Sequence, residues 1–142
     1  MTTAAYLLDA NTFRLYKAGH PAVMLRVADF VDALCLSSVT VEEMVVGRLS
    51  LINRARSGKG GIRVSDAHAA FAELLADVQP FPLLAYGEAA DAVYRAFSAA
   101  TIRIGAQDCR IAAQAIAHNM TVVTRNVRDF EAIGAPCADW SV

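Results

Sequence analysis

Residues 108–134 read DCRIAAQAIAHNMTVVTRNVRDFEAIG, and this segment gives the clearest indication of the fold class. Its first part carries apolar residues at helical spacing, so we expect a helix over 106–118. The short β-branched run that follows is typical of a buried strand, expected over 120–124. A helix leading into a buried strand is the repeating unit of a parallel sheet covered by helices.

The same alternation extends toward the start of the chain. Further strands are expected over 4–8, 33–38 and 81–84, and further helices near 11–18, 21–32, 41–56, 65–78 and 87–99. The order predicts an α/β fold whose central, mostly parallel sheet has four to five strands and is flanked by helices. The glycine-rich stretch SGKGG at 57–61 is expected to separate two helices of one domain rather than two domains.

Length and composition restrict what kind of protein this is. The chain has 142 residues, the size of one domain, and we expect a single domain over 1–142. A hydrophobic fraction of 56% excludes disorder, while charged residues interrupt each apolar stretch before it is long enough to span a membrane. The first ten residues lack the features of a secretory signal, so the expected location is the cytoplasm.

Charge and cysteine content give further limits. The net charge is −1, so there is no overall basic field of the kind that marks many nucleic-acid-binding proteins. The three cysteines, Cys35, Cys109 and Cys137, have neither zinc-site spacing nor an even number, and we expect them to be reduced and structural.

Four acidic residues follow or adjoin expected strand ends. Asp9 comes directly after the first strand, Glu43 begins the helix after the second, Asp108 opens the helix 106–118, and Asp129 lies just past the strand 120–124. In an open parallel sheet, ligands bind outside the carboxyl ends of the strands, so we expect these four carboxylates to lie on one rim.

Clustered carboxylates repel one another, and a divalent cation removes that cost. Mg²⁺ or Mn²⁺ takes oxygen ligands and binds through a few carboxylates together with substrate phosphate oxygens, as in phosphodiester hydrolysis. A structural interpretation stays open for each acid. Thr40 and Glu43 have the spacing of a capping box, Asn126 and Asp129 have similar spacing, and an acid such as Asp108 is favoured by a helix dipole.

Four segments together resemble a known family. LLDANTF (7–13), SSVTVEEMVVG (37–47), DCRIAAQAIAHN (108–119) and TVVTRNVRDFEAIG (121–134) resemble, in order, the motifs of VapC-type PIN domains. The resemblance spans nearly the whole chain, and the second half carries the more specific motifs. It implies a compact α/β fold, an acidic Mg²⁺ or Mn²⁺ site, and the endoribonuclease activity of a toxin in a type II toxin–antitoxin system.

The resemblance assigns roles to individual residues. Asp9, Glu43, Asp108 and Asp129 match the family's catalytic, metal-binding acids, and Glu43 is preferred to Glu42 because it stands immediately before the apolar Met44. Three polar residues are expected to support the site, namely Asn11, Thr124 and Asn126. The family's usual Asp-Thr-Asn reads Asp9, Ala10, Asn11 here, which removes a hydroxyl but no expected ligand.

Contacts with RNA and with partner proteins are also expected. Residues 44–64 contain several basic residues and no acid, so Arg48, Arg54, Arg56 and Lys59 are candidate phosphate contacts, together with Arg125 and Arg128 beside the fourth acid. The resemblance implies a homodimer and a cognate VapB-like antitoxin whose carboxy-terminal segment covers the acidic rim. No membrane partner is expected.

Alternative functions differ in the residues they require. A haloacid-dehalogenase-like phosphatase needs a second aspartate where this chain has Asn11, and a receiver domain needs an early acid pair and a lysine on its last strand. SGKGG lacks the spacing of a phosphate-binding loop. Within the family, a solitary RNA-processing nuclease and a catalytically inactive binding module stay open, although the intact set of four acids argues against the second.

Overall fold

A computed structural model of the chain describes residues 5–142. Its centre is a sheet of five strands: β1 (Tyr6–Leu8), β2 (Leu34–Ser37), β3 (Leu83–Leu84), β4 (Thr121–Val123) and β5 (Cys137–Ala138). The strand order is β3-β2-β1-β4-β5, and each neighbouring pair is parallel. The prediction of a parallel α/β sheet is therefore confirmed, and the four expected strands are present with slightly shorter bounds over the described residues.

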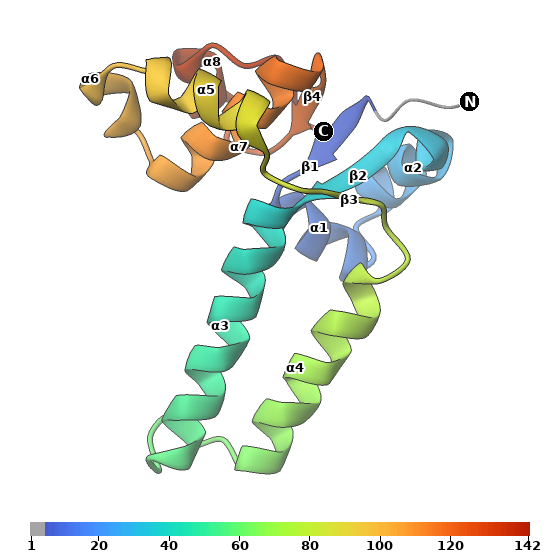
Figure 1. Cartoon of the computed structure of the whole chain (residues 1–142). Helices are drawn as coiled ribbons and strands as arrows, with labels where there is room; N and C mark the ends of the chain where they lie inside the picture. Colours follow the sequence, from blue (N-terminus) through green and yellow to red (C-terminus); the bar gives the residue numbers. More distant parts are fainter. Residues whose placement is uncertain (1–4) are drawn as a thin grey trace.

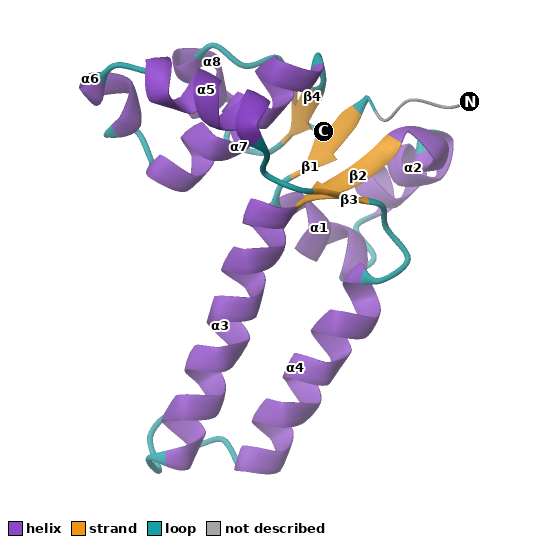
Figure 2. Ribbon diagram, in the orientation of Figure 1, coloured by secondary structure: helices purple, strands orange, loops and turns teal. Residues whose placement is uncertain are grey.

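Eight α-helices and one 3-10 turn accompany the sheet in the described part of the chain (Figures 1 and 2). They are α1 (Ala10–Lys17), α2 (Pro21–Asp29), the 3-10 turn η1 (Val31–Ala33), α3 (Ser38–Arg56), α4 (Val64–Val78), α5 (Glu88–Ala96), α6 (Ala99–Ile102), α7 (Ala106–His118) and α8 (Val127–Ile133).

The strands are short and apolar because both faces of the sheet are buried. Successive residues of β1 point to opposite faces, so Leu7 packs in one core with α7 and α8 while Leu8 packs in another with α1, α2 and α3. Both leucines are fully buried. Figure 1 shows the corresponding layers, with α5 to α8 on one side of the sheet and α1 and α2 on the other.

Three elements were not expected from the sequence: the edge strand β5 and the helices α6 and α8. β5 and α6 are only two and four residues long, so they offer little periodicity to detect. Helix α8 ends at Gly134, whose positive φ of 101° suits the left-handed residue after a helix. Helix α3 also begins earlier than expected, because Ser37 rather than Thr40 caps it.

Helices α3 and α4 form a long hairpin that extends away from the sheet (Figure 1). The turn between them contains Gly58, Gly60 and Gly61, all with positive φ, so the expected break at 57–61 does separate two helices. The hairpin has a small core of its own, in which Ile52, Ala55 and Ala67 are buried.

Two further expectations concern the cysteines and the membrane. Cys35, Cys109 and Cys137 are free, and burial raises the pKa of the Cys35 thiol to about 11, which keeps it unreactive. None of the helices in residues 5–142 is both long and apolar enough to cross a bilayer.

Candidate active site at the carboxyl edge of the sheet

Asp9 lies at the carboxyl end of β1, the central strand. Its side chain caps α1 by accepting a hydrogen bond of 2.8 Å from the backbone N–H of Thr12. The hydroxyl of Thr12 in turn donates to the carbonyl of Val123 at 3.1 Å, which ties α1 to the end of β4. Asp9 is thus buried, at 8% exposure, and held in a fixed orientation at the rim.

Glu43 lies in the second turn of α3 rather than the first, because the helix begins at Ser38. The capping-box interpretation is therefore wrong: Ser37 caps the helix by accepting from the N–H of Val39. Thr40 is buried inside the helix, and its hydroxyl has no partner among the described residues. Glu43 is exposed, so its carboxylate is free of a capping role.

Nearby charges perturb Glu43. Partial burial raises its pKa, the negative charge of Asp108 raises it further, the positive charge of Arg14 lowers it, and Asp9 adds a smaller increase. Carboxylates from α3, α7 and the end of β1 therefore share one electrostatic environment.

Asp108 stands in the first turn of α7, where the helix dipole favours a negative charge. Its pKa is nevertheless raised, first by burial and then by the negative charges of Asp9 and Asp129, while the amide of Asn126 acts in the opposite direction. Repulsion from two acids therefore outweighs the stabilising partner, as expected for a rim where acids converge.

Asp129 is on the first turn of α8, just after β4. The side-chain amide of Asn126 donates to its Oδ2 at 2.8 Å, and the hydroxyl of Thr124 accepts from the backbone N–H of Asn126 at 2.9 Å. Thr124 is completely buried. A chain of hydrogen bonds therefore runs from the buried end of β4 to the fourth carboxylate.

The four acids thus gather at one edge of the sheet, but they do not form a closed cage. In residues 5–142, no three acidic, cysteine or histidine side chains lie close enough together to surround one ion. A hard cation such as Mg²⁺ does not need such a cage, since it binds through one or two carboxylates and keeps several waters. The all-oxygen donors and their mutual repulsion suit such an ion.

Asn11 does not contact Asp9. Its exposed amide oxygen accepts a hydrogen bond of 3.0 Å from Arg14, and the partner of Asp9 is instead the backbone of Thr12. Arg14 and Arg125 line one depression of about 410 Å³ beside Asn11. The sequence analysis missed Arg14, although its position one helical turn after Asn11 places both on the same face.

The basic residues expected to contact RNA are spread over very different distances from the rim. Arg125 and Arg128 adjoin Asp129, and both are exposed. On α3, Arg54 lies roughly 16 Å along the helix axis from Glu43, and Arg56 lies roughly 20 Å from it. The side chain of Arg48 donates to the carbonyl of Ala70, so it joins α3 to α4.

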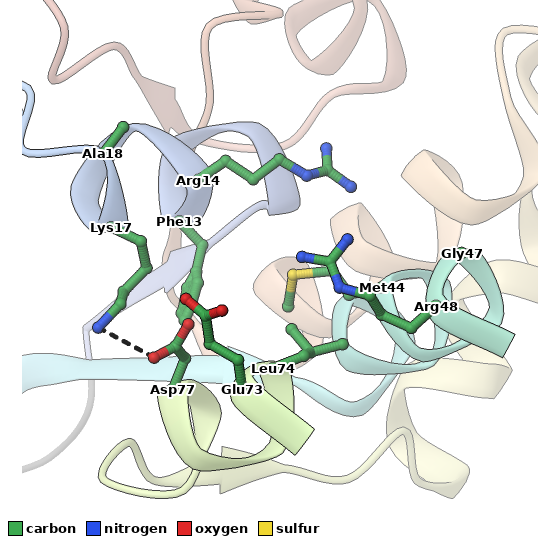
Figure 3. Close-up of a pocket in the computed structure, with 10 residues that line it drawn as sticks. All are labelled: Phe13, Arg14, Lys17, Ala18, Met44, Gly47, Arg48, Glu73, Leu74 and Asp77. Atoms are coloured by element: carbon green, nitrogen blue, oxygen red, sulfur yellow. Dashed lines mark ion pairs between the residues drawn. The ribbon is translucent and has the colours of Figure 1, made fainter. Parts of the chain in front are cut away.

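A groove lies between α1, α3 and α4 (Figure 3). Its floor contains the buried side chains of Phe13, Met44 and Leu74. Figure 3 shows Arg14 and Arg48 on one side and the ion pair of Lys17 with Asp77 on another, the Nζ–Oδ1 distance being 3.2 Å. The volume is about 310 Å³, and the lining includes Met44, which follows Glu43, and Arg14, whose positive charge lowers the pKa of Glu43.

Comparisons with known proteins agree with this architecture. The family model described as PIN domain matches residues 6–136. Among solved structures, the DNA-bound VapBC from Salmonella typhimurium is 24% identical, with a TM-score of 0.77 over 96% of this chain and 98% of that chain. VapBC-1 from nontypeable Haemophilus influenzae is 22% identical, with a TM-score of 0.70 over 97% and 99%.

A third solved structure, FitAcB from Neisseria gonorrhoeae, is 25% identical, with a TM-score of 0.64 over 95% of this chain and 97% of that chain. No curated protein sequence matches the chain.

Proposed function

The chain belongs to the PIN-domain family, and from this premise we propose that it is a metal-dependent endoribonuclease that hydrolyses RNA phosphodiester bonds. PIN domains are in general nucleases, which supports hydrolysis of a phosphodiester bond as the reaction class. We further propose that residues 1–142 act as one catalytic domain, because a single sheet joins elements from both ends of the described chain.

The observation that carries the proposal is the electrostatic effect of the neighbouring acids on Asp108 and Glu43. Asp9 and Asp129 raise the pKa of Asp108, and Asp108 and Asp9 raise that of Glu43, in each case in addition to burial. The four acids come from separate segments, and two of them, Glu43 and Asp108, are harder to ionise because of their neighbours, a cost that no structural role of these acids explains. A bound cation would offset the repulsion between these carboxylates and so account for their arrangement.

Asp9, Glu43, Asp108 and Asp129 are the residues that would hold Mg²⁺ or Mn²⁺. When bound, such an ion supplies charge stabilisation for the phosphodiester group and lowers the pKa of water. The chain's own groups orient the ligands: the N–H of Thr12 fixes Asp9, and the amide of Asn126 fixes Asp129. Thr124 positions Asn126.

The positive groups near the rim are suited to the RNA backbone. Arg14 and Arg125 border the acids from α1 and from the segment after β4, and Arg128 follows on α8. Each can neutralise a phosphate without contacting a base. We assign Arg48 to the wall of the groove, and Arg54, Arg56 and Lys59 to phosphates several nucleotides away.

We also propose that the enzyme is a toxin inhibited by a VapB-like antitoxin. The similar solved structures include VapBC from Salmonella typhimurium and VapBC-1 from Haemophilus influenzae, and one from Klebsiella pneumoniae is a toxin–antitoxin complex. The groove between α1, α3 and α4 offers a surface for a partner of this kind. Its apolar floor and mixed charged walls suit a peptide segment carrying both apolar and charged side chains. Exposed apolar side chains such as Leu25 and Val46 support a homodimer. We also propose that the protein acts in the cytoplasm.

The experiment that tests the function is cleavage of total RNA by the purified protein with Mg²⁺, with Mn²⁺ and with EDTA. We expect discrete cuts with either metal and none with EDTA. In Asp9→Asn and Asp108→Asn the rate should fall at least about 100-fold, as for other groups that hold a reacting centre. Asparagine also caps helices, so Asp9→Asn keeps the cap of α1.

Asp32→Asn is the matched control, because Asp32 is an exposed acid in η1, at the opposite end of β2 from the rim. It should cleave like the wild type. If the wild type cuts no RNA with either metal, the chain is a binding module instead. If both rim variants cut at the wild-type rate, the assignment of the four acids is wrong. If the protein cuts RNA but no small antitoxin-like gene lies beside its own gene, the interpretation as a solitary RNA-processing nuclease would be favoured.

A further inference from the structure

A second cavity is lined by residues of α3 and α7 and by Tyr86, and none of its lining residues lines the groove or the depression beside Arg14. It has a volume of about 760 Å³ and is lined by Ser38, Val39, Glu42, Tyr86, Gln107 and Arg110. Two of these residues directly precede acids of the rim, since Gln107 stands before Asp108 and Glu42 before Glu43. The two helices that line the cavity, α3 and α7, are therefore the ones that carry Glu43 and Asp108 of the rim.

We propose that this cavity binds a nucleobase of the RNA next to the scissile phosphate, and that it sets a base preference for cleavage. The proposal rests on the endoribonuclease function argued above and deepens it. The residues involved are Tyr86, Gln107 and Arg110, with Glu42 as the acidic partner.

The polar groups of the cavity are already oriented. The amide nitrogen of Gln107 donates to Glu42 at 3.1 Å, and the amide oxygen accepts from Arg110 at 2.9 Å. These two bonds fix which end of the amide faces each neighbour. The amide retains one further N–H donor and one further lone pair on its oxygen. The edge of a base can accept from the first and donate to the second.

Planar groups accompany this amide. The guanidinium of Arg110 lies over the ring of Tyr94, with its central carbon 4.6 Å from the ring centroid, and is thereby fixed in plane. Tyr86 is held at both ends, because its N–H donates to Ser38 at 2.9 Å and its hydroxyl donates to Asp91 at 3.0 Å. Unstacked RNA bases are bound by aromatic rings and by guanidinium planes of this kind.

The charges of the cavity favour a base over a phosphate. Glu42 contributes a carboxylate opposite the guanidinium of Arg110, so an anion that approached Arg110 would also meet a negative charge. A neutral base that offers both donors and acceptors can donate to the carboxylate of Glu42 and accept from the guanidinium of Arg110. The depression lined by Arg14 and Arg125 has no acid among its described lining residues and suits a phosphate instead.

The test uses the metal-free protein, so that binding is measured without cleavage. The side-chain amide signals of Gln107 are followed by NMR while AMP, GMP, CMP or UMP is added, and ribose 5-phosphate serves as the probe that has the phosphate but no base. We expect at least one mononucleotide to shift these signals saturably, with a Kd on the order of 1 mM, as is reasonable for so small a ligand. Ribose 5-phosphate should leave them unchanged.

A second measurement compares cut sites in a randomised single-stranded RNA. In Gln107→Ala the base preference beside the cut should flatten at one position by roughly fivefold or more, since a lost base contact is worth about 1 to 3 kcal/mol. Gln79→Ala, an exposed glutamine at the end of α4, should keep the wild-type preference.

Each result has a definite meaning. Equal shifts with ribose 5-phosphate, or no shift with any of the four mononucleotides, would overturn the base pocket. An unchanged preference in Gln107→Ala would overturn it as well. If mononucleotides bind at Gln107 but the protein cuts no RNA, the pocket stands and the nuclease function fails.

Discussion

The acidic rim and the α3–α4 hairpin differ in how each is held together. The rim brings together side chains from four segments that are far apart in the sequence, and the negative charges of neighbouring acids raise the pKa values of Glu43 and Asp108. The hairpin is one continuous stretch of chain, with a small apolar core around Ile52, Ala55 and Ala67.

This difference indicates that the hairpin stabilises the fold, whereas repulsion between the acids of the rim destabilises it. At the rim, hydrogen bonds from Thr12 and Asn126 hold carboxylates in place against their repulsion. In the hairpin, apolar packing and regular helix stabilise a segment that carries no acid of the rim beyond Glu43, near its base. Changes to the two regions should therefore affect activity and stability separately.

The largest expected effect is on the hairpin core. Ile52→Ala removes a side chain that is only 4% exposed, and it should lower the free energy of unfolding by about 2 to 4 kcal/mol. Chemical denaturation measures this loss. RNA cleavage per folded molecule should stay close to the wild-type value at low temperature.

Leu49→Ala is the matched control on the same helix, because Leu49 is 44% exposed. It should cost less than about 1 kcal/mol. If Ile52→Ala lost as much cleavage as Asp108→Asn while remaining folded, the hairpin and the rim would not be separable.

A change on the face of α3 that borders the groove should affect the partner alone. A Cβ added at Gly47 meets no atom within 4 Å, and Gly47 lines the groove, so in Gly47→Trp the indole should occupy part of the groove. We expect the antitoxin to inhibit this variant at least about tenfold less well, a loss of about 1.4 kcal/mol. Dose–inhibition curves measured with co-purified antitoxin give the value.

Gly47→Ala serves as the control, since it adds only a methyl group and favours the helix by up to about 1 kcal/mol. Its inhibition should match the wild type. Full inhibition of Gly47→Trp would place the antitoxin outside this groove.

The smallest expected effect is the pH dependence of the metal-free protein. Because the pKa values of Asp108 and Glu43 are raised in the folded state, the folded protein binds more protons than the unfolded chain in the interval between the two sets of pKa values. Their contribution to stability therefore falls as the pH rises through that interval, which begins near the ordinary values of 3.8 and 4.5.

Thermal unfolding in EDTA across this range measures the slope. Asp108→Asn should flatten it, and Mg²⁺ should oppose the loss, since a ligand that binds only the folded state stabilises it. An identical slope in Asp108→Asn would mean that this acid does not contribute to the repulsion.

Much of the fold could be predicted from the sequence. The strands expected over 33–38 and 120–124 and the helix expected over 106–118 are present because apolar periodicity is a local property of the chain. The start of α3 could not be predicted in the same way. Thr40 and Glu43 have capping-box spacing, but Ser37 makes the cap and the buried Thr40 lies inside the helix.

The candidate site also has residues that could be predicted from the sequence and residues that could not. The four acids could be proposed from their positions after strands and from the family motifs. Arg14 beside Asn11 could not, and neither could the pairing of Gln107 with Glu42, because these contacts depend on how α1, α3 and α7 approach one another. The distance of Arg54 and Arg56 from the rim follows only once α3 is known to extend away from the sheet.

The parallel α/β class, the helical hairpin with its glycine turn and the positions of the acids after strands could all be inferred from the amino-acid sequence. Each of these features depends on residues close together in the chain, where period, propensity and turn chemistry act. The surroundings of the acids became known only from the folded chain: the arginines that flank them, the amides that orient them, and the cavity, depression and groove near them. Such contacts arise from the packing of distant segments, and local chemistry does not encode them.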